Sequence, residues 1–213
     1  MTEHNEILNS QNWKDFKRAL EPLEPKDKGE PFEELTRLYL LTEPTFSTKI
    51  KKVWHHKKIP QKVMDELGLV RPELGVDLLA QVKDGTYWAI QCKYHSDQTR
   101  NVSLKEISTF FSVTERKKTY SKLSHRLVCT SANEISRNVQ KLHSEKLGYL
   151  TSADFSKLGK DEFNAFRDLL NDGDRKLVPF HPRPHQSVAL DKCVSHFKNR
   201  KNKRGKIIHP CGS

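Results

Sequence analysis

Residues 75–95 read GVDLLAQVKDGTYWAIQCKYH and contain two runs in which apolar and polar side chains alternate. The pair Asp84-Gly85 separates the two runs, and such a pair is typical of a tight turn between strands. A period of two indicates β-strands, because successive side chains of a strand point to opposite faces of a sheet. The stretch therefore predicts two antiparallel strands joined by a short loop.

The length of the loop decides which residues pair across the hairpin. A two-residue turn would set apolar residues opposite polar ones. A three-residue loop at 83–85, with Gly85 in the left-handed conformation, pairs Val82 with Thr86 instead. This register places apolar residues opposite one another in the pairs Ala80 with Trp88, Leu78 with Ile90 and Val76 with Cys92. We predict this register, because burial of an apolar face fixes the pairing of strands.

The same register gathers polar side chains on the other face of the hairpin. Asp77 falls opposite Gln91, and Lys93 follows one pleat along. Asp77 offers the hard oxygen ligands that Mg²⁺ prefers, and Gln91 offers a neutral carbonyl oxygen. An ammonium at Lys93 is able to orient an attacking water or to offset charge that grows on a phosphate. These residue types suit metal-assisted hydrolysis of a phosphodiester bond.

Asp77 and the run Gln91-Cys92-Lys93 resemble the catalytic motif of the PD-(D/E)xK nucleases, in the Mrr-like branch where the last element is QxK. The proline of that motif is missing here, since Gly75-Val76 precede the aspartate. The resemblance implies an α/β, restriction-endonuclease-like fold with a central mixed sheet flanked by helices. It also implies Mg²⁺ as cofactor and double-stranded DNA as substrate. Glutamine in place of glutamate removes a negative charge, so another carboxylate is needed nearby.

An amphipathic helical pattern upstream of the hairpin offers that carboxylate in Glu33 or Glu34. In Mrr-like nucleases a Phe-Glu pair on the first core helix supplies an acid to the metal site, and Phe32-Glu33 matches this pair. The resemblance therefore favours Glu33 and implies a metal site formed by Asp77, Glu33 and Gln91. Two solvated glutamates on a helix surface are the alternative.

The composition points to a polyanionic partner. The chain has 213 residues and a formal net charge of +11, with 31% charged and 35% hydrophobic residues. A strongly basic balance favours binding to nucleic acid, although simple solubility is an alternative. The four cysteines form no CxxC pair, which argues against a zinc site. The sequence shows no signal peptide and no apolar run of membrane-spanning length, so we expect a cytoplasmic protein without a membrane partner.

A lysine-rich strand predicted within 46–54 is a candidate DNA-contacting edge. The candidate residues are Lys49, Lys51, Lys52 and Lys57. Lysines that protect an edge strand from aggregation are an equally good alternative. Adjacent His55 and His56 make a poor chelate, because neighbouring residues of a strand point to opposite faces. Thr130, at the end of a strand predicted at 125–131, is a further DNA-contact candidate.

Capping signals predict the next helices. Ser103 with Glu106 forms one capping box, and Ser131 with Glu134 forms a second, whose helix we expect to run to about residue 146. A short strand and a last helix follow. The predicted order of elements is α-β-α-ββ-α-β-α-β-α, which is typical of a layered α/β fold.

We expect three parts along the chain. Residues 1–26 form a helical arm, whose role as a packing or a regulatory segment the sequence leaves open. Residues 27–172 form the Mrr-like nuclease domain. Residues 173–213 form a linker and the start of a superfamily 2 helicase domain.

Two stretches of the last part resemble motifs of superfamily 2 helicases. Arg183-Pro184-His185-Gln186 resembles the Q-motif, in which the glutamine contacts adenine. GKIIHPCGS, with Gly212 and Ser213 at its end, resembles the strand that leads into the phosphate-binding loop. A complete loop continues with Gly-Lys-Ser/Thr. We therefore expect no ATP hydrolysis by this chain alone.

A nuclease followed by such a motor resembles the start of the single-polypeptide, ATP-dependent restriction-modification enzymes called type ISP. The resemblance implies helicase, methyltransferase and target-recognition domains in the same polypeptide, with ATP driving the motor. We therefore expect the sequence to be part of a longer protein.

The leading interpretation is a Mg²⁺-dependent DNA endonuclease domain with Asp77, Gln91, Lys93 and Glu33 as catalytic residues. A non-catalytic DNA-binding or docking module of a helicase and a junction-resolving nuclease are the alternatives.

Overall fold

The computed structural model describes residues 4–70, 75–141, 146–171 and 184–198. The chain divides into two compact units, residues 1–178 and 179–213. The described part of the second unit is helix α11 (Pro184–Lys198), which exposes several large apolar side chains. Among the described residues, no helix is both long enough and apolar enough to cross a lipid bilayer.

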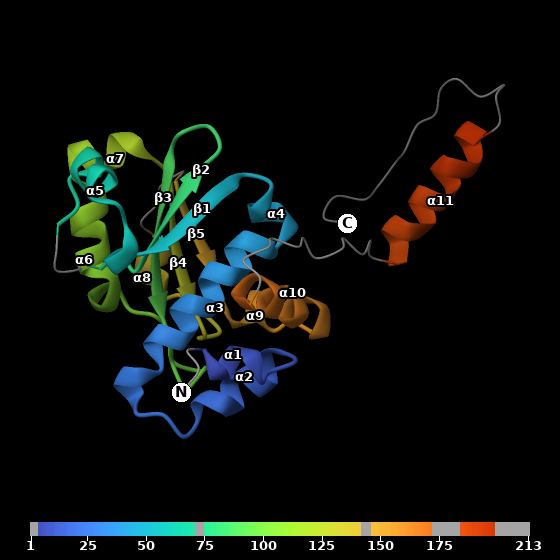
Figure 1. The fold of residues 1–213 in the computed structure, drawn as a ribbon, viewed down its shortest axis with the longest axis horizontal. Coiled ribbons are helices and arrows are strands. Elements are labelled where there is room, and N and C mark those ends of the chain that lie inside the picture. The colour runs from blue at the N-terminus through green and yellow to red at the C-terminus, as the bar shows by residue number, and fades with distance from the viewer. Residues whose placement is uncertain (1–3, 71–74, 142–145, 172–183, 199–213) are drawn as a thin grey trace. The chain divides into compact units, whose positions relative to one another are not determined.

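The first unit is built on a five-stranded mixed sheet with the strand order β1-β2-β3-β4-β5 (Figure 1). The pairs β1-β2 and β2-β3 are antiparallel, whereas the pairs β3-β4 and β4-β5 are parallel. The strands are β1 (Ile50–His55), β2 (Leu78–Val82), β3 (Tyr87–Lys93), β4 (Leu123–Thr130) and β5 (Leu147–Leu150). The predicted α/β class with a central mixed sheet is confirmed.

Helices cover both faces of this sheet (Figure 1). On one face α3 (Gly29–Thr42) and α10 (Lys160–Asn171) enclose a core that includes Leu78, Ile90 and Cys92. On the other face α5 (Gln61–Leu67) and α6 (Leu104–Thr114) enclose a second core, and α7 (Lys117–Lys122) packs against both helices. The remaining helical segments of the first unit are α1 (Asn5–Leu8), α2 (Trp13–Leu20), α4 (Pro44–Ser47), α8 (Arg137–Gln140), α9 (Ser152–Phe155) and the 3₁₀ turns η1 (Pro25–Asp27) and η2 (His56–Lys58).

The N-terminal segment packs into the first core. Trp13, Phe16 and Leu20 of α2 are all buried there. The Trp13 ring stacks on Phe155, with 5.3 Å between the ring centroids. In this structure residues 5–20 therefore help to build the first unit.

The β2-β3 hairpin has the predicted three-residue loop. The Val82 amide donates to the Thr86 carbonyl at 2.9 Å, and Gly85 has a φ of +89°. The Asp84 carboxylate accepts a hydrogen bond from the Thr86 amide at 2.9 Å, which stabilises the turn locally. The pairs Ala80 with Trp88 and Leu78 with Ile90 also form. The predicted register is confirmed over the regular part of the hairpin.

The predicted placement of Val76 opposite Cys92 on one apolar face is wrong. Cys92 lies in the first core, whereas Val76 lies in the second. Gly75 has a φ of +80° and lies against the backbone of Phe110, so the chain turns before the regular strand begins at Leu78. The alternation of side chains between the two faces of the sheet therefore does not extend to the residues before β2.

The helix predicted to start at the Ser131–Glu134 capping box is also wrong. The Ser131 hydroxyl hydrogen bonds instead to the backbone of His95, and Ile135 forms a bridge with Val102. These contacts hold the segment after β4 out of helical geometry, and the helix that follows is the four-residue α8. The Ser103–Glu106 capping box does form, at the start of α6. The predicted first strand begins later than expected, at Ile50, because 44–47 form α4.

Gly75→Ala should destabilise the first unit more than Gly85→Ala. Both substitutions strain a left-handed residue, at a cost of about 1–2 kcal/mol. At Gly75 the added methyl would also lie 2.7 Å from the Phe110 backbone nitrogen, whereas at Gly85 nothing lies within 4 Å. We expect a further loss of about 1–3 kcal/mol at Gly75 alone. Urea unfolding followed by tryptophan fluorescence measures both, and equal losses would contradict the close approach.

Candidate active site

Asp77 lies immediately before β2, and its amide, its carbonyl and its carboxylate each form a hydrogen bond with a backbone group. Its amide donates to the Ile90 carbonyl at 3.0 Å, and its carbonyl accepts from the His56 amide at 2.9 Å. Its carboxylate accepts a hydrogen bond from the Cys92 amide at 2.5 Å. Strand amides point sideways within a sheet, so the carboxylate, which is almost fully buried, lies in the plane of the sheet beside β3.

Gln91 and Lys93 flank Cys92 on β3. Because Cys92 faces the α3 side of the sheet, alternation turns the two flanking side chains toward the α6 side. Gln91 is 3% exposed, and among the described residues its Oε1 has no hydrogen-bond partner. Lys93 is half-buried at the strand end and takes part in none of the ion pairs formed between described residues. Gln91 and Lys93 thus face the side of the sheet opposite to α3, the helix that carries Glu33.

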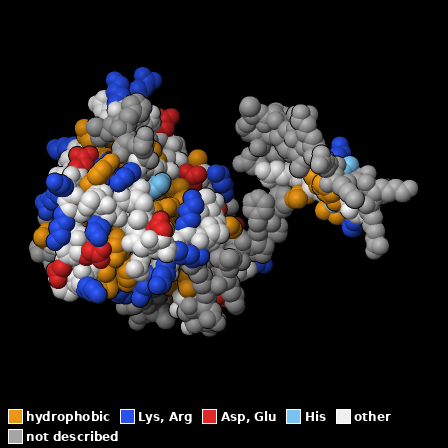
Figure 2. Space-filling model, turned by 90° about the horizontal axis from the view of Figure 1, so that it is seen from above, with side chains coloured by type: hydrophobic (Ala, Val, Ile, Leu, Met, Phe, Trp, Pro, Cys, Tyr) orange, Lys and Arg blue, Asp and Glu red, His pale blue; other side chains and the backbone are white. Residues whose placement is uncertain are grey.

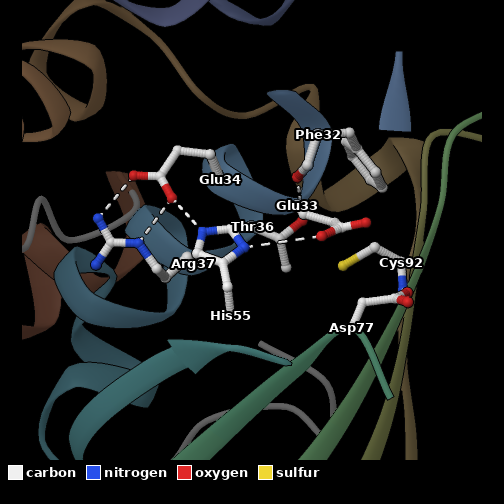
Figure 3. A network of polar contacts seen from close by, with 8 residues as sticks. All are labelled: Phe32, Glu33, Glu34, Thr36, Arg37, His55, Asp77 and Cys92. Carbon is white, nitrogen blue, oxygen red and sulfur yellow. Dashed lines mark hydrogen bonds and ion pairs between the residues drawn. The ribbon is translucent and has the colours of Figure 1, made fainter. Parts of the chain in front are cut away.

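The two acids on α3 have different surroundings. Glu34 is 3% exposed and receives hydrogen bonds from Nε and Nη2 of Arg37 at 2.8 and 2.7 Å. It also binds Nε2 of His55 at 2.6 Å. The Glu33 side chain is 26% exposed, and its Oε2 lies 3.7 Å from Nδ1 of His55. In Figure 3 the Glu33 carboxylate extends toward Cys92 and Asp77, while Glu34 turns away to Arg37.

The electrostatics of this network follow from burial and pairing. Burial alone would raise the pKa of Glu34, but the hydrogen bonds from Arg37 and His55 outweigh it and hold that pKa well below its usual value. Burial alone would lower the pKa of His55, yet its contacts with Glu33 and Glu34 raise it to about 9. At neutral pH the network therefore contains two cations, His55 and Arg37, and an ionised Glu34.

Cys92 lies between the acids as a neutral thiol. Burial raises its pKa, and the neighbouring Cys129, Asp77 and Glu33 raise it further. Cys129 is its partner in the register of the parallel strands β3 and β4. A thiol that stays protonated adds no charge between Asp77 and Glu33.

Sequence reasoning missed His55, Arg37 and Cys92 as parts of this network. The neighbouring His56 has different surroundings, since it begins η2 and its Nε2 lies 3.1 Å from the Val70 carbonyl oxygen. The spacing of Glu34 and Arg37 by three residues on a helix was a usable signal for an ion pair. The approach of His55 to the helix was not visible, because it depends on how β1 packs against α3.

The candidate DNA-contacting lysines lie on the exposed edge of the sheet. A bulge between Ile50 and Lys52 interrupts the pairing of β1 with β2, and it leaves two consecutive residues of the strand exposed. The four candidates Lys49, Lys51, Lys52 and Lys57 are all exposed. Lysine and arginine side chains are also spread widely over the face of the first unit shown in Figure 2. Positive charge is therefore not confined to the β1 edge.

Thr130 has a structural role in this structure. It is fully buried, its hydroxyl donates to the Lys93 carbonyl at 2.8 Å, and it accepts from the Ala132 amide at 3.1 Å. We therefore do not include it in a DNA-contacting surface. Of the predicted nucleotide-binding residues, Gln186 lies on α11 of the second unit, while Gly212 and Ser213 lie outside the described residues.

The predicted metal ligands offer oxygen atoms, which a hard divalent cation prefers. Among the described residues, no group of three or more His, Cys, Asp or Glu side chains could hold a metal ion. The predicted set contains two carboxylates, from Asp77 and Glu33, and an amide oxygen from Gln91. The buried Oε1 of Gln91 without a partner is an acceptor that a cation would satisfy.

Comparison with known proteins places the chain in a family. The restriction endonuclease family Mrr_cat_2 matches residues 41–164, which include Asp77, Gln91 and Lys93. No curated protein matches the sequence. A solved structure described as the ATP-dependent Type ISP restriction-modification enzyme LlaBIII bound to DNA has a similar fold, with a TM-score of 0.61 and 22% sequence identity. The similarity covers 94% of this chain and 12% of that one. Because the family match extends over more than half of the sequence, this chain belongs to the Mrr_cat_2 family of restriction endonucleases.

Proposed function

We propose that the chain is a Mg²⁺-dependent DNA endonuclease that hydrolyses phosphodiester bonds. The observation that carries this proposal is the buried Asp77 carboxylate, which accepts a hydrogen bond from the amide of Cys92, the residue between Gln91 and Lys93 in the sequence. Glu33 adds a second carboxylate from α3. Membership of a restriction endonuclease family supports nuclease chemistry at this site.

Each residue of the site has a distinct role in this proposal. Asp77, Glu33 and Gln91 hold the metal through oxygen atoms. Mg²⁺, when bound, lowers the pKa of a water and stabilises negative charge on the leaving oxygen. The Lys93 ammonium orients the attacking water or offsets charge on the phosphate. The fixed carboxylate of Asp77 needs no rearrangement before it acts, because a backbone amide already orients it.

The exposed lysines of the β1 edge are the proposed phosphate contacts, namely Lys49, Lys51, Lys52 and Lys57. Contacts to phosphates fix the position of a duplex but carry little sequence information. The sequence shows no obvious base-reading motif. We therefore expect cleavage by this chain alone to have little sequence preference.

The whole protein is proposed to be an ATP-driven, type ISP restriction-modification enzyme of the cytoplasm. This rests on the helicase-like motifs that include Gln186, Gly212 and Ser213, and on the fold shared with a much longer enzyme. The chain spans only 12% of that enzyme. Helicase, methyltransferase and target-recognition domains of the same polypeptide would supply translocation and sequence specificity.

Asp77→Asn and Lys93→Ala should each lower Mg²⁺-dependent nicking of supercoiled plasmid by at least about a hundredfold. DNA affinity should change little, because phosphate contacts dominate it. Asparagine keeps the acceptor for the Cys92 amide, so the fold should be preserved. Nicking is compared in Mg²⁺ and in EDTA, and affinity is measured by anisotropy of a labelled duplex.

Wild-type activity in both variants would show that the site is wrongly assigned. A wild-type chain that binds duplex DNA without cutting it in Mg²⁺ would support a non-catalytic DNA-binding module. Strong preference for branched over linear DNA would support a junction-resolving nuclease.

Glu33→Gln and Glu34→Gln should separate the acid of the site from the acid of the scaffold. Glu33→Gln should lower cleavage about tenfold or more and leave the melting temperature unchanged. Glu34→Gln removes the buried partner of Arg37 and His55, and should cost about 1–3 kcal/mol of stability. Its cleavage per folded molecule should fall less than that of Glu33→Gln, because Glu34 acts only through His55. Thermal melting and plasmid nicking measure the two effects, and the reverse pattern would assign the metal to Glu34.

Replacing Lys51 and Lys52 together with glutamate should weaken DNA binding. The slope of log affinity against log salt should fall by about two, one for each lost phosphate contact. The matched control changes Lys117 and Lys118 on α7, which are exposed and alter the net charge equally. Equal losses in the two variants would mean that overall charge, rather than the β1 edge, binds DNA.

A further inference from the structure

His55 joins the two elements that carry the acids of the site. It is the last residue of β1 and pairs with Leu78 of β2. The next residue, His56, donates its amide to the Asp77 carbonyl at 2.9 Å. The backbone that carries the His55 ring is therefore hydrogen bonded to the backbone that carries Asp77.

The two ring nitrogens of His55 face different carboxylates. Nε2 binds Oε2 of Glu34 at 2.6 Å, and Nδ1 lies 3.7 Å from Oε2 of Glu33 (Figure 3). Two hydrogen bonds from Arg37 in turn hold the Glu34 carboxylate. The ring is thus fixed on its Glu34 side, and its other nitrogen points at the one acid of the pair that extends toward Asp77.

We propose that His55 is a positioning residue, which holds the Glu33 carboxylate in the orientation that binds the metal beside Asp77. This inference rests on the proposed function. The Glu33 side chain is 26% exposed. A partly exposed glutamate has several rotamers open to it, and water competes for its oxygens. The His55 ring, which Glu34 holds on its other side, restricts the rotamers of Glu33. Hydrogen-bond partners of metal ligands do the same in other sites.

Glu34 and Arg37 act in this proposal through His55 alone. Glu34 is 3% exposed, and its oxygens already bind Arg37 and His55, so its carboxylate is occupied. Glu34 and Arg37 therefore do not bind the metal themselves. They are connected to it only through His55 and Glu33. Neighbouring glutamates on one helix turn take the two roles because they point in different directions.

Two amide substitutions of His55 test the positioning role. The amide nitrogen of asparagine lies about where Nδ1 lies, and that of glutamine about where Nε2 lies. His55→Asn should therefore keep the donor to Glu33 and lose the one to Glu34, whereas His55→Gln should do the reverse. The measured quantities are Mn²⁺ affinity of the 213-residue chain, from the electron paramagnetic resonance signal of free Mn²⁺, and the melting temperature without metal.

His55→Gln should bind Mn²⁺ about tenfold or more weakly and melt close to the wild type. His55→Asn keeps an amide N–H facing Glu33 but loses the contact with Glu34, so it should bind Mn²⁺ more tightly than His55→Gln and melt at a lower temperature. Arg37→Met is the control for general damage: it should lower the melting temperature, and because it leaves the His55 contact with Glu33 in place, it should weaken Mn²⁺ binding much less than His55→Gln does. The positioning role is overturned if His55→Gln binds like the wild type, or if His55→Asn or Arg37→Met binds as weakly as His55→Gln.

Asp77→Asn distinguishes failure of this inference from failure of the proposed function. If Asp77→Asn loses Mn²⁺ binding while His55→Gln keeps it, the metal site stands and only the role of His55 is wrong. If Asp77→Asn binds Mn²⁺ like the wild type, the metal site itself is wrong and the positioning role falls with it.

Discussion

The hydrogen bond between the Cys92 amide and the Asp77 carboxylate is the contact on which the site depends. A strand amide needs an acceptor, and a buried carboxylate needs a donor. The chain turns at Gly75, so the Asp77 carboxylate takes the position next to β3 that a backbone carbonyl would take in a regular strand. One hydrogen bond therefore satisfies both the amide and the carboxylate. The acid is therefore fixed by the same bonding that forms the sheet. Gln91 and Lys93 flank the donor residue on β3.

The helix opposite supplies two adjacent acids whose surroundings divide their roles. Glu34 is buried and is stabilised as an anion by Arg37 and His55, which is the usual condition for a charge in a protein interior. Glu33 is more exposed and extends toward Cys92 and Asp77. The same His55 contacts both acids, so the scaffold and the site share one residue. The buried ion pairs of Glu34 thus also fix His55, which contacts the Glu33 carboxylate that the proposed chemistry uses.

Local chemistry explains which features could be predicted from the sequence. The hairpin register follows from Gly85 and from alternation within β2 and β3, all of which are local, and the α6 capping box is local too. Val76 and the segment after Ser131 were mispredicted because tertiary contacts override local pattern: Gly75 lies on the Phe110 backbone, and Ser131 bonds to His95. Asp77, Gln91 and Lys93 could be chosen from residue type and spacing. His55 could not, because its partners lie on a helix about twenty residues upstream.

The sheet order sets the distance between the proposed phosphate contacts and the proposed metal site. β1 is the edge strand and β2 is its neighbour, so the two backbones lie roughly 5 Å apart. From Lys52 to His55, which pairs beside the start of β2, the strand advances three residues, or about 10 Å. That span is short compared with a DNA duplex, whose strands carry a phosphate for every 3.4 Å of helix axis. One duplex can therefore reach both places, with the bulge in β1 presenting Lys51 and Lys52 outward while the buried strands behind it keep Asp77 fixed.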